Sequence, residues 1–406
     1  PLLKAHTLVF KDIIGQASVK AHLIDMVQHN RLSHALLFLG KEGSGALPLA
    51  INFAQFVVSQ PAASEPVADL FGGFTPMEAG PPYKSPEDLA EDPSYLRAAK
   101  LLHPDLHFSY PVISKKPGEK PVSADYISDW RDFYLQFPYG NIYDWLQFIG
   151  AENKQGNITA EECNEIIHKL SLKSFESAYK VLVLWMPEYL GKEGNKLLKL
   201  IEEPPPNTLF ILVAESEEQI LPTLLSRCQL IRVPLLSNEE VENALFERAK
   251  ASKETASQIA GIAEGNYREA LQLLQHAEED WQSYLREWLN ATLKGGPAAQ
   301  VKFTEEAAKL GREKQKQFLR YFNHLLQMSI RIKVLGADQV KMGDQEKDFA
   351  IRLNKIASVS QQQAIIEELD KASYYIERNA NGKMLFQALT LKLYHIIQNK
   401  TLILND

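Results

Sequence analysis

A glycine-rich stretch near the N-terminus has the spacing of a phosphate-binding loop but lacks its charged residues. The stretch GKEGSGALPLA starts at Gly40, and a working loop of this kind reads G-x-x-x-x-G-K-[ST]. Gly40 and Gly45 are correctly spaced, with Gly43 between them, but Ala46 takes the lysine position and Leu47 the Ser/Thr position. Those two side chains would have contacted the β/γ-phosphates and magnesium. The loop predicts a degenerate site that binds no cofactor, although a chance strand-to-helix turn explains the loop alone equally well.

The acidic half of such a site is missing as well. In working enzymes of this type, residues at the end of a second strand hold magnesium and orient the attacking water. Here the apolar run VLVL is followed by Trp185, Met186, Pro187 and Glu188. Trp and Met offer no oxygen ligand to magnesium, and Glu188 is interpreted as a solvated loop carboxylate. No metal site is expected.

Short apolar runs, separated by helical patterns, would position these residues. The runs ALLFL, VLVL, LFILV and QLIRV are interpreted as strands at 35–39, 181–184, 209–213 and 229–233. Apolar strands that alternate with helices are typical of a parallel sheet covered on both faces, which is an α/β fold. Residues 60–121 contain eleven of the chain's 21 prolines and show little periodicity. We interpret them as an insertion or long loop.

The pattern is helical from about residue 236 to the end of the chain. Ser237 followed three residues later by Glu240 is a capping box, which predicts the start of a helix. An apolar stripe at helical spacing is formed by Leu385, Leu389, Leu393 and Ile396. Burial in the core of this chain is the first interpretation of the stripe, and burial against a neighbouring subunit is the alternative.

Length and composition exclude several classes of protein. A chain of 406 residues is expected to form two or three domains. Its only cysteines, Cys163 and Cys228, exclude a disulfide framework and a multi-cysteine zinc site, and both are interpreted as packed thiols. The net charge of −7 argues against a self-sufficient nucleic-acid binder, without excluding a local basic face. No apolar run is long enough to span a membrane and the N-terminal stretch does not resemble a signal peptide, so a cytoplasmic protein is expected.

Two longer stretches carry a more specific signal. They read NKLLKLIEEPPPNTLFILVAE at 195–215 and ILPTLLSRCQLIRVPLL at 220–236, and they resemble the clamp-loader subunits of the AAA+ ATPases. In that family a helix ending in LLK-x-LEEPP precedes a strand reading T-x-FIL, and a short helix then ends in SRC. The family's opening and its sensor-two helix are matched by FKDIIGQ, RLSHALLF and GNYREAL. The resemblance covers roughly residues 8–60 and 155–280.

The resemblance implies an architecture in three parts. An α/β AAA+ module at 1–235, with an inactive nucleotide site and the insertion at about 60–121, would be followed by a helical lid at 236–280 and an all-α collar at 281–406. Many relatives carry a four-cysteine zinc module after the phosphate loop. The corresponding region here contains no cysteine, so no zinc is implied.

The resemblance also implies a role for one arginine. In such rings each ATP lies between two subunits, and an arginine of the next subunit contacts its phosphates. That arginine would be Arg227, in the SRC motif formed with Ser226 and Cys228, while Arg268 stands at the sensor-two position. A guanidinium suits the role because it is always charged and forks onto phosphate oxygens. Without the flanking motif, a surface arginine at a helix C-terminus would be the simpler interpretation.

The implied function is that of a non-hydrolysing clamp-loader subunit of DNA polymerase III. Its implied partners are the ATP-hydrolysing tau/gamma subunits, the delta subunit and, through the complex, the sliding clamp and primer–template DNA. The chain would belong to a hetero-oligomer without a membrane component, and would be part of a DNA-directed DNA polymerase complex without being an enzyme by itself. Two alternatives stay open: an active ATP-binding subunit with an altered loop, and a helical scaffold unrelated to replication.

Overall fold

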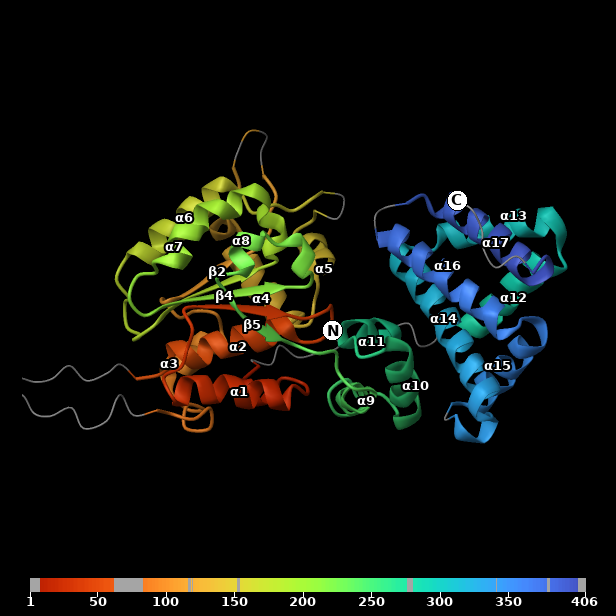
Figure 1. The fold of residues 1–406 in the computed structure, drawn as a ribbon, viewed down its shortest axis with the longest axis horizontal. Helices are drawn as coiled ribbons and strands as arrows, with labels where there is room; N and C mark the ends of the chain where they lie inside the picture. Colours follow the sequence, from red (N-terminus) through yellow and green to blue (C-terminus); the bar gives the residue numbers. More distant parts are fainter. Residues whose placement is uncertain are drawn as a thin grey trace, which may run out of the picture. The chain divides into compact units, whose positions relative to one another are not determined.

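The computed structural model describes residues 8–61, 83–115, 118, 120–151, 154–275, 280–340, 342–377 and 380–400 of the 406. The chain forms two compact units, whose elements are labelled in Figure 1. Unit 1 comprises Pro1–Ala251 and Glu264–Leu271, and unit 2 comprises Ser252–Ala263 and Gln272–Asp406. The division into three parts with boundaries near 235 and 280 stays a prediction.

A five-stranded parallel sheet forms the centre of unit 1. Its strands are β1 (Ala35–Leu39), β2 (Leu106–Ser109), β3 (Lys180–Trp185), β4 (Thr208–Ala214) and β5 (Gln229–Arg232). Their order is β2-β3-β4-β1-β5, and every pairing is parallel. Leu212 of β4 pairs with both Leu37 of β1 and Leu184 of β3. The predicted α/β fold with a parallel sheet is therefore confirmed.

Helices cover both faces of the sheet (Figure 1), which explains why its central strands are apolar at consecutive positions. One face carries α1 (Ala17–Gln28), α2 (Ala46–Val58), α3 (Pro93–Ala99), α4 (Ile127–Gln136) and α5 (Ile142–Phe148). The other face carries α6 (Ala160–Ser171), α7 (Leu198–Glu202) and α8 (Pro222–Leu225). Leu36 and Phe38 belong to the core on the first face, whereas Leu37 packs on the second with Cys163 and Ile166 of α6.

β2 lies inside the segment 60–121 that the sequence favours as an insertion or long loop. Residues 62–82 of that segment lie outside the described residues. After them come α3 and then β2, whose Phe108 pairs with Val183 of β3. The later part of the segment therefore contributes a strand to the sheet. A four-residue edge strand reading LHFS gives no apolar run, and nearby prolines argue against a strand.

Short 3-10 helices connect several of these elements. They are η1 (Phe10–Asp12), η2 (Ser123–Tyr126), η3 (Pro187–Leu197) and η4 (Glu217–Gln219) in unit 1, and η5 (Ala337–Gln339) in unit 2. Helix α9 (Asn238–Glu247) follows β5, and the capping box predicted at its start is confirmed. The Ser237 hydroxyl accepts a hydrogen bond from the Glu240 N–H at 3.2 Å, and the Glu240 carboxylate accepts one from the Ser237 N–H at 2.8 Å.

Unit 2 is helical throughout its described residues. Its helices are α10 (Lys253–Ala263), α12 (Trp281–Leu293), α13 (Gly296–Lys309), α14 (Arg312–Leu335), α15 (Asp344–Ile356), α16 (Val359–Glu377) and α17 (Gly382–Gln398), while α11 (Tyr267–Gln275) begins in unit 1. Trp288 lies at the centre of an aromatic core and donates its indole N–H to Thr390 at 2.9 Å. In the predicted apolar stripe of α17, Leu389, Leu393 and Ile396 are buried in this chain. None of the helices in the described ranges is both long and apolar enough to cross a membrane.

Candidate functional site

The glycine-rich loop joins β1 to α2, as the sequence predicts. β1 ends at Leu39 and α2 begins at Ala46. Gly43 and Gly45 have φ angles of +72° and +89°, a region that residues with a side chain rarely adopt. A Cβ atom on Gly43 would lie only 1.9 Å from Oδ1 of Asn266. This position therefore requires glycine for space as well as for conformation.

The two positions that would carry the phosphate-loop chemistry are buried. Ala46 and Leu47 are 7% and 6% exposed and belong to the apolar core of unit 1. Tyr139 packs against the loop: a ring carbon lies 3.1 Å from a Cβ built on Gly45, and its hydroxyl accepts a hydrogen bond from the Ile14 N–H at 2.9 Å. Apolar contacts of Ala46 and Leu47, and the ring of Tyr139, therefore take the place of the lysine and hydroxyl side chains of a working loop.

The space left around the loop is too small for a nucleotide. The cavity lined by the loop, Tyr139, Trp185 and Glu215 has a volume of about 30 Å³. Pockets that hold a drug-sized ligand enclose roughly 300–1,000 Å³. In this conformation the loop has room for water only.

The guanidinium of Arg268 is paired with carboxylates of its own chain. Its side chain is 4% exposed. Nε and Nη2 donate to the two oxygens of Asp144 at 2.5 and 2.6 Å, and Nη1 donates to Glu42 at 3.1 Å. Glu42, which lies within the glycine-rich loop, also accepts hydrogen bonds from Asn141 at 2.7 Å and from Asn266 at 3.1 Å. The loop, α5 and the start of α11 are thus tied together by one buried charge network.

Two further acids lie where β3 and β4 end. The Glu188 Oε1 accepts hydrogen bonds from the backbone N–H groups of Glu215 at 2.7 Å and Ser216 at 3.0 Å. Its Oε2 is buried without a hydrogen-bond partner among the described residues. The interpretation of Glu188 as a solvated loop carboxylate is therefore wrong, because its side chain points back to the end of β4. No group of three His, Cys, Asp or Glu side chains within the described ranges could hold a metal ion.

The environment of these acids disfavours their charged forms. Burial raises the pKa of Glu188. Burial also raises the pKa of Glu215 to about 8, and the negative charges of Glu42 and Glu188 add to that effect. Glu215 is therefore largely protonated at neutral pH, so that a cluster of three carboxylates beside the loop carries less than its formal charge.

The SRC residues lie at the C-terminal end of α8. Arg227 is about one-third exposed and forms an ion pair with Glu202 at the end of α7. Its Nε donates to Glu202 at 2.6 Å, and its Nη1 donates to the carbonyl of Thr223 at 2.6 Å and to the hydroxyl of Ser226 at 3.1 Å. Contacts with the last carbonyls of a helix are what a simple C-terminal arginine would also make.

The structure brings together only part of the set of site residues predicted from the sequence. Gly40, Gly43, Gly45, Ala46 and Leu47 surround the small cavity. The network of Arg268 reaches the same loop through Glu42, whereas the SRC residues line no part of that cavity. Cys228 is half-buried and Cys163 fully buried, and burial raises the pKa of both thiols to about 11. Both cysteines are therefore unreactive thiols at neutral pH.

The sequence interpretation missed three residues that shape this site: Glu42, Tyr139 and Asp144. Glu42 carried a usable signal, because an acid inside a phosphate-binding loop would repel the phosphates of a nucleotide. Tyr139 and Asp144 carried none, since their roles depend on contacts with the loop and α11 that lie far away in sequence.

Comparisons with known proteins find similarity to subunits of DNA polymerase III. Residues 96–237 match the family described as DNA polymerase III, delta subunit. The DNA polymerase III subunit delta' of Bacillus subtilis is 26% identical over 263 residues, which are 65% of this chain and 60% of that protein. The subunit delta' of Haemophilus influenzae is 33% identical over 105 residues, 25% of this chain and 30% of that protein.

Gamma subunits are also similar. The gamma subunit of Buchnera aphidicola subsp. Schizaphis graminum is 34% identical over 144 residues, which are 34% of this chain and 39% of that protein. The chain thus spans less than two thirds of the length of these relatives. A solved gamma-subunit-related protein of Thermotoga maritima superposes over 92% of this chain and 98% of its own, with 14% identity and a TM-score of 0.36. The strand order, and not that score, defines the fold. The similarity to clamp-loader subunits predicted from the motifs is confirmed.

Proposed function

We propose that this relative of the clamp-loader subunits of DNA polymerase III is a delta-prime-type subunit that binds no ATP and supplies Arg227 to the ATP site of a neighbouring subunit. One observation carries the first half of the proposal. Arg268, the arginine expected at the sensor-two position, is already paired with Asp144 and with Glu42 of the glycine-rich loop. The carboxylates of the chain itself thus neutralise the charge that phosphates would otherwise use.

A bound nucleotide would have to displace this network. Its negatively charged phosphates would be repelled by the carboxylate of Glu42. Releasing Arg268 to bind them would leave Asp144 without its bidentate partner. Removing one partner from a buried ion pair costs about 3–5 kcal/mol. Because Ala46 and Leu47 supply neither a cation nor a metal ligand in return, ATP binding would not recover that cost. The chain is therefore not an ATPase by itself.

The position of Arg227 supports its role toward a neighbour. Among the described residues, its carboxylate partner is Glu202, whose side chain is 45% exposed. An exposed ion pair contributes about 0–1 kcal/mol, so the guanidinium can exchange Glu202 for a phosphate at little cost. An arginine supplied to a phosphoryl-transfer site contributes about 10³–10⁵ in rate, and a planar fork is the geometry that suits phosphate oxygens.

The remaining parts of the proposal follow from the similarity to clamp-loader subunits. The chain would assemble in the cytoplasm with tau/gamma ATPase subunits and a delta subunit, through a helical collar at 281–406, and would contact the sliding clamp and primer–template DNA through that complex. The complex would load the clamp onto primed DNA. The module at 1–235 and the lid at 236–280 are proposed as the AAA+ part of the chain.

The test is ATP hydrolysis by a reconstituted complex. Complexes would contain wild-type chain, Arg227→Ala or Arg227→Lys, and the rate would be measured with clamp and primed DNA. We expect a clear loss with Arg227→Ala and poor rescue by Arg227→Lys, because a point charge does not reproduce the fork. The loss would be partial, since other sites in the ring keep their own arginines.

Arg232→Ala is the matched control. Arg232 lies five positions away, is 70% exposed and is 3.7 Å from Glu217, so its removal deletes an exposed arginine of the same unit. Equal rates for Arg227→Ala and Arg232→Ala, with assembly verified by gel filtration, would overturn the proposed role of Arg227. Equilibrium dialysis of the isolated chain with labelled ATP separates the alternative of an active ATP-binding subunit, which requires micromolar binding.

A further inference from the structure

A second and larger cavity lies in unit 1. Its volume is about 540 Å³, within the roughly 300–1,000 Å³ of pockets that hold small ligands. It shares no lining residue with the glycine-rich loop. Three of its lining residues are Lys115, Lys120 and Lys154, and its described lining contains neither Asp, Glu nor Arg. All charged residues in the described lining are thus positive, in a chain whose net charge is −7.

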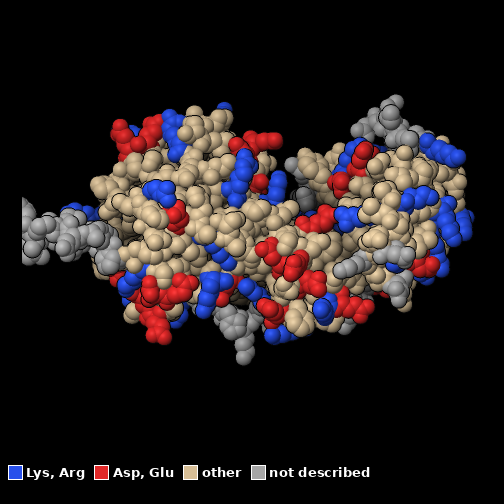
Figure 2. Space-filling view, turned by 60° about the horizontal axis from the view of Figure 1, so that its bottom comes forward, with Lys and Arg blue, Asp and Glu red and all other residues tan. Residues whose placement is uncertain are grey.

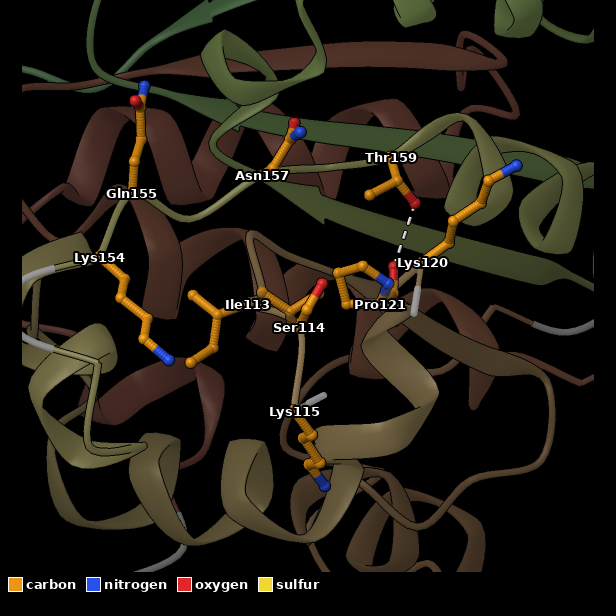
Figure 3. Close-up of a pocket in the computed structure, with 10 residues that line it drawn as sticks. Ile113, Ser114, Lys115, Lys120, Pro121, Lys154, Gln155, Asn157 and Thr159 are labelled. Atoms are coloured by element: carbon orange, nitrogen blue, oxygen red, sulfur yellow. Dashed lines mark hydrogen bonds between the residues drawn. The ribbon is translucent and has the colours of Figure 1, made fainter. Parts of the chain in front are cut away.

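The three lysines come from three segments of the chain. Lys115 lies in the loop after β2, Lys120 in the stretch before η2, and Lys154 between α5 and α6. Figure 3 shows their side chains on separate sides of the pocket, so that the ammonium groups do not converge on one point. This arrangement suits a ligand that carries several negative charges along its length better than it suits a single small anion.

Contacts of the backbone hold these segments in place. Val112 and Asn157 exchange two backbone hydrogen bonds of 3.0 Å each, which join the segment of Lys115 to that of Lys154. The Thr159 hydroxyl donates to the carbonyl of Pro121 at 3.0 Å, which joins the segment of Lys120 to the start of α6 (Figure 3). Within the described residues, hydrogen bonds thus connect the three segments that carry the lysines.

Among the described residues, the neighbours of Lys115 and Lys120 cancel little of the charge of these two lysines. The Lys115 ammonium donates to the carbonyl of Asp125 at 2.8 Å and lies 4.3 Å from the ring centroid of Tyr126, and both of these partners are neutral. Lys120 is 73% exposed and 3.9 Å from Glu161, a separation and exposure at which an ion pair contributes little. The next acid on α6, Glu162, accepts a hydrogen bond from the Ser123 N–H at 2.7 Å.

The face shown in Figure 2 does not offer the same environment. On the face shown in Figure 2, Lys and Arg side chains are interspersed with Asp and Glu and form no continuous basic stripe. General attraction of a polyanion to this face is therefore weak, and binding there would require a local site of one sign. The cavity with its three lysines is such a site.

We propose that this cavity binds a chain of phosphate groups, carried either by a nucleic-acid strand or by a free polyphosphate or nucleotide. A chain of phosphates fits the three lysines because lysine binds a phosphate group as a point charge, and because such a chain carries negative charge at each group along its length. Gln155, Asn157 and Ser114 line the same cavity and bring polar side chains to its wall. The inference does not depend on the role proposed for Arg227.

Binding would be measured with the full chain by fluorescence anisotropy. The probe is a labelled single-stranded DNA oligonucleotide, and the competitors are unlabelled tripolyphosphate and ATP. Each titration is carried out in 50 mM and in 200 mM salt. Three contacts to a single strand predict a slope of about −2 in log K against log salt, which is an affinity loss of about 20-fold between the two salt concentrations. With Lys120→Gln and Lys154→Gln combined, one contact is left and the loss falls to about 3-fold. At 50 mM salt, this double variant should bind the oligonucleotide about tenfold or more weakly than the wild type does.

A matched control removes two lysines elsewhere. Lys173 and Lys302 are both exposed, and Lys173→Gln combined with Lys302→Gln changes the net charge by the same amount. We expect this pair to bind as the wild type does. All four side chains are exposed, so we expect both double variants to fold. Far-UV circular dichroism would check that they do.

The arms of the experiment separate the two sources of phosphate. Competition by tripolyphosphate or ATP at the concentration that DNA requires would assign the site to free phosphate chains. DNA binding that resists these competitors would assign it to a strand. No binding of either probe, equal effects of the two lysine pairs, or stronger binding of a poly-glutamate peptide would overturn the proposal.

Discussion

Arg268 and Arg227 lie in the same unit and differ in how their charge is neutralised. Arg268 is 4% exposed, and its carboxylate partners Asp144 and Glu42 are 21% and 23% exposed. The side chain of Arg227 is 33% exposed and that of its partner Glu202 is 45% exposed. A buried pair cannot exchange one partner without leaving a charge uncompensated, whereas an exposed pair can. Arg268 therefore serves its own fold, and Arg227 is available to a neighbour.

The largest effect is expected when the buried arginine is removed. Arg268→Met would leave Asp144 and Glu42 without their cation, and the free energy of unfolding of unit 1 should fall by about 3–5 kcal/mol. Urea denaturation followed by circular dichroism would measure the loss. Arg268→Lys should recover only part of it, because a single ammonium cannot serve both carboxylates in the same geometry. A loss below about 1 kcal/mol, typical of exposed pairs, would remove the contrast between the two arginines.

The next effect concerns the loop on which Arg268 acts. Ala46→Lys combined with Leu47→Thr restores the phosphate-loop residues, but both positions are buried and the cavity is about 30 Å³. We expect a stability loss of about 1–3 kcal/mol from overpacking. We also expect no ATP hydrolysis, which needs acids that hold magnesium, because Glu188 is bonded to backbone N–H groups and Glu215 is largely protonated. A phosphate-release assay with the purified double variant decides the point. Magnesium-dependent ATP hydrolysis would contradict this expectation, because it would show that the two loop substitutions alone had abolished activity.

A smaller effect tests the acids beside the buried network through pH. Folded Glu215 keeps its proton up to a pKa of about 8, whereas the unfolded chain releases it near the ordinary pKa of about 4.3. The unfolded state thus binds fewer protons between these values, and the free energy of unfolding falls as pH rises through this window, by up to about 1.4 kcal/mol per pH unit.

Glu215→Gln should remove this part of the pH dependence. The difference in unfolding free energy between the variant and the wild type should shift in favour of the variant by about 2–2.5 kcal/mol from pH 5.5 to pH 7.5. Chemical denaturation at several pH values would measure it. A difference that does not change with pH would mean that Glu215 is ionised in the folded chain.

The smallest effect on stability is expected at the exposed arginine. Arg227→Met removes contacts with Glu202, Thr223 and Ser226. The effect is expected to be small because these contacts are exposed, although they are several. Exposed ion pairs contribute about 0–1 kcal/mol, and the unfolding free energy should change by no more than that. The same urea titration used for Arg268→Met provides the comparison. A loss equal to that of Arg268→Met would make Arg227 a structural residue as well.

Features with a continuous local signal could be predicted from the sequence. The strands β1, β3 and β4 are buried on both faces, so they appear as apolar runs, and their ends were placed to within one or two residues. The capping box at Ser237 is local in the same sense. β2 was missed because four residues at the edge of the sheet leave no run to detect.

The candidate site was only partly predictable for the same reason. The glycine spacing and the missing lysine at Ala46 can be read within eight residues. The pairs that occupy the site join residues 226 and 124 positions apart, and no local pattern indicates them. Glu188 was misread because its partners are the N–H groups at the end of β4, which the sequence of its own loop does not reveal.

The separation of Arg268 from its partners sets the order in which the protein is completed on the ribosome. All five strands end by Arg232, so the sheet is synthesised before the cation that neutralises Asp144 and Glu42. At roughly 5–20 residues per second, the 124 positions from Asp144 to Arg268 take roughly 6–25 s. A transcript truncated between these points, even one that encodes every strand, would yield a domain that lacks the arginine of the charge network beside its central loop.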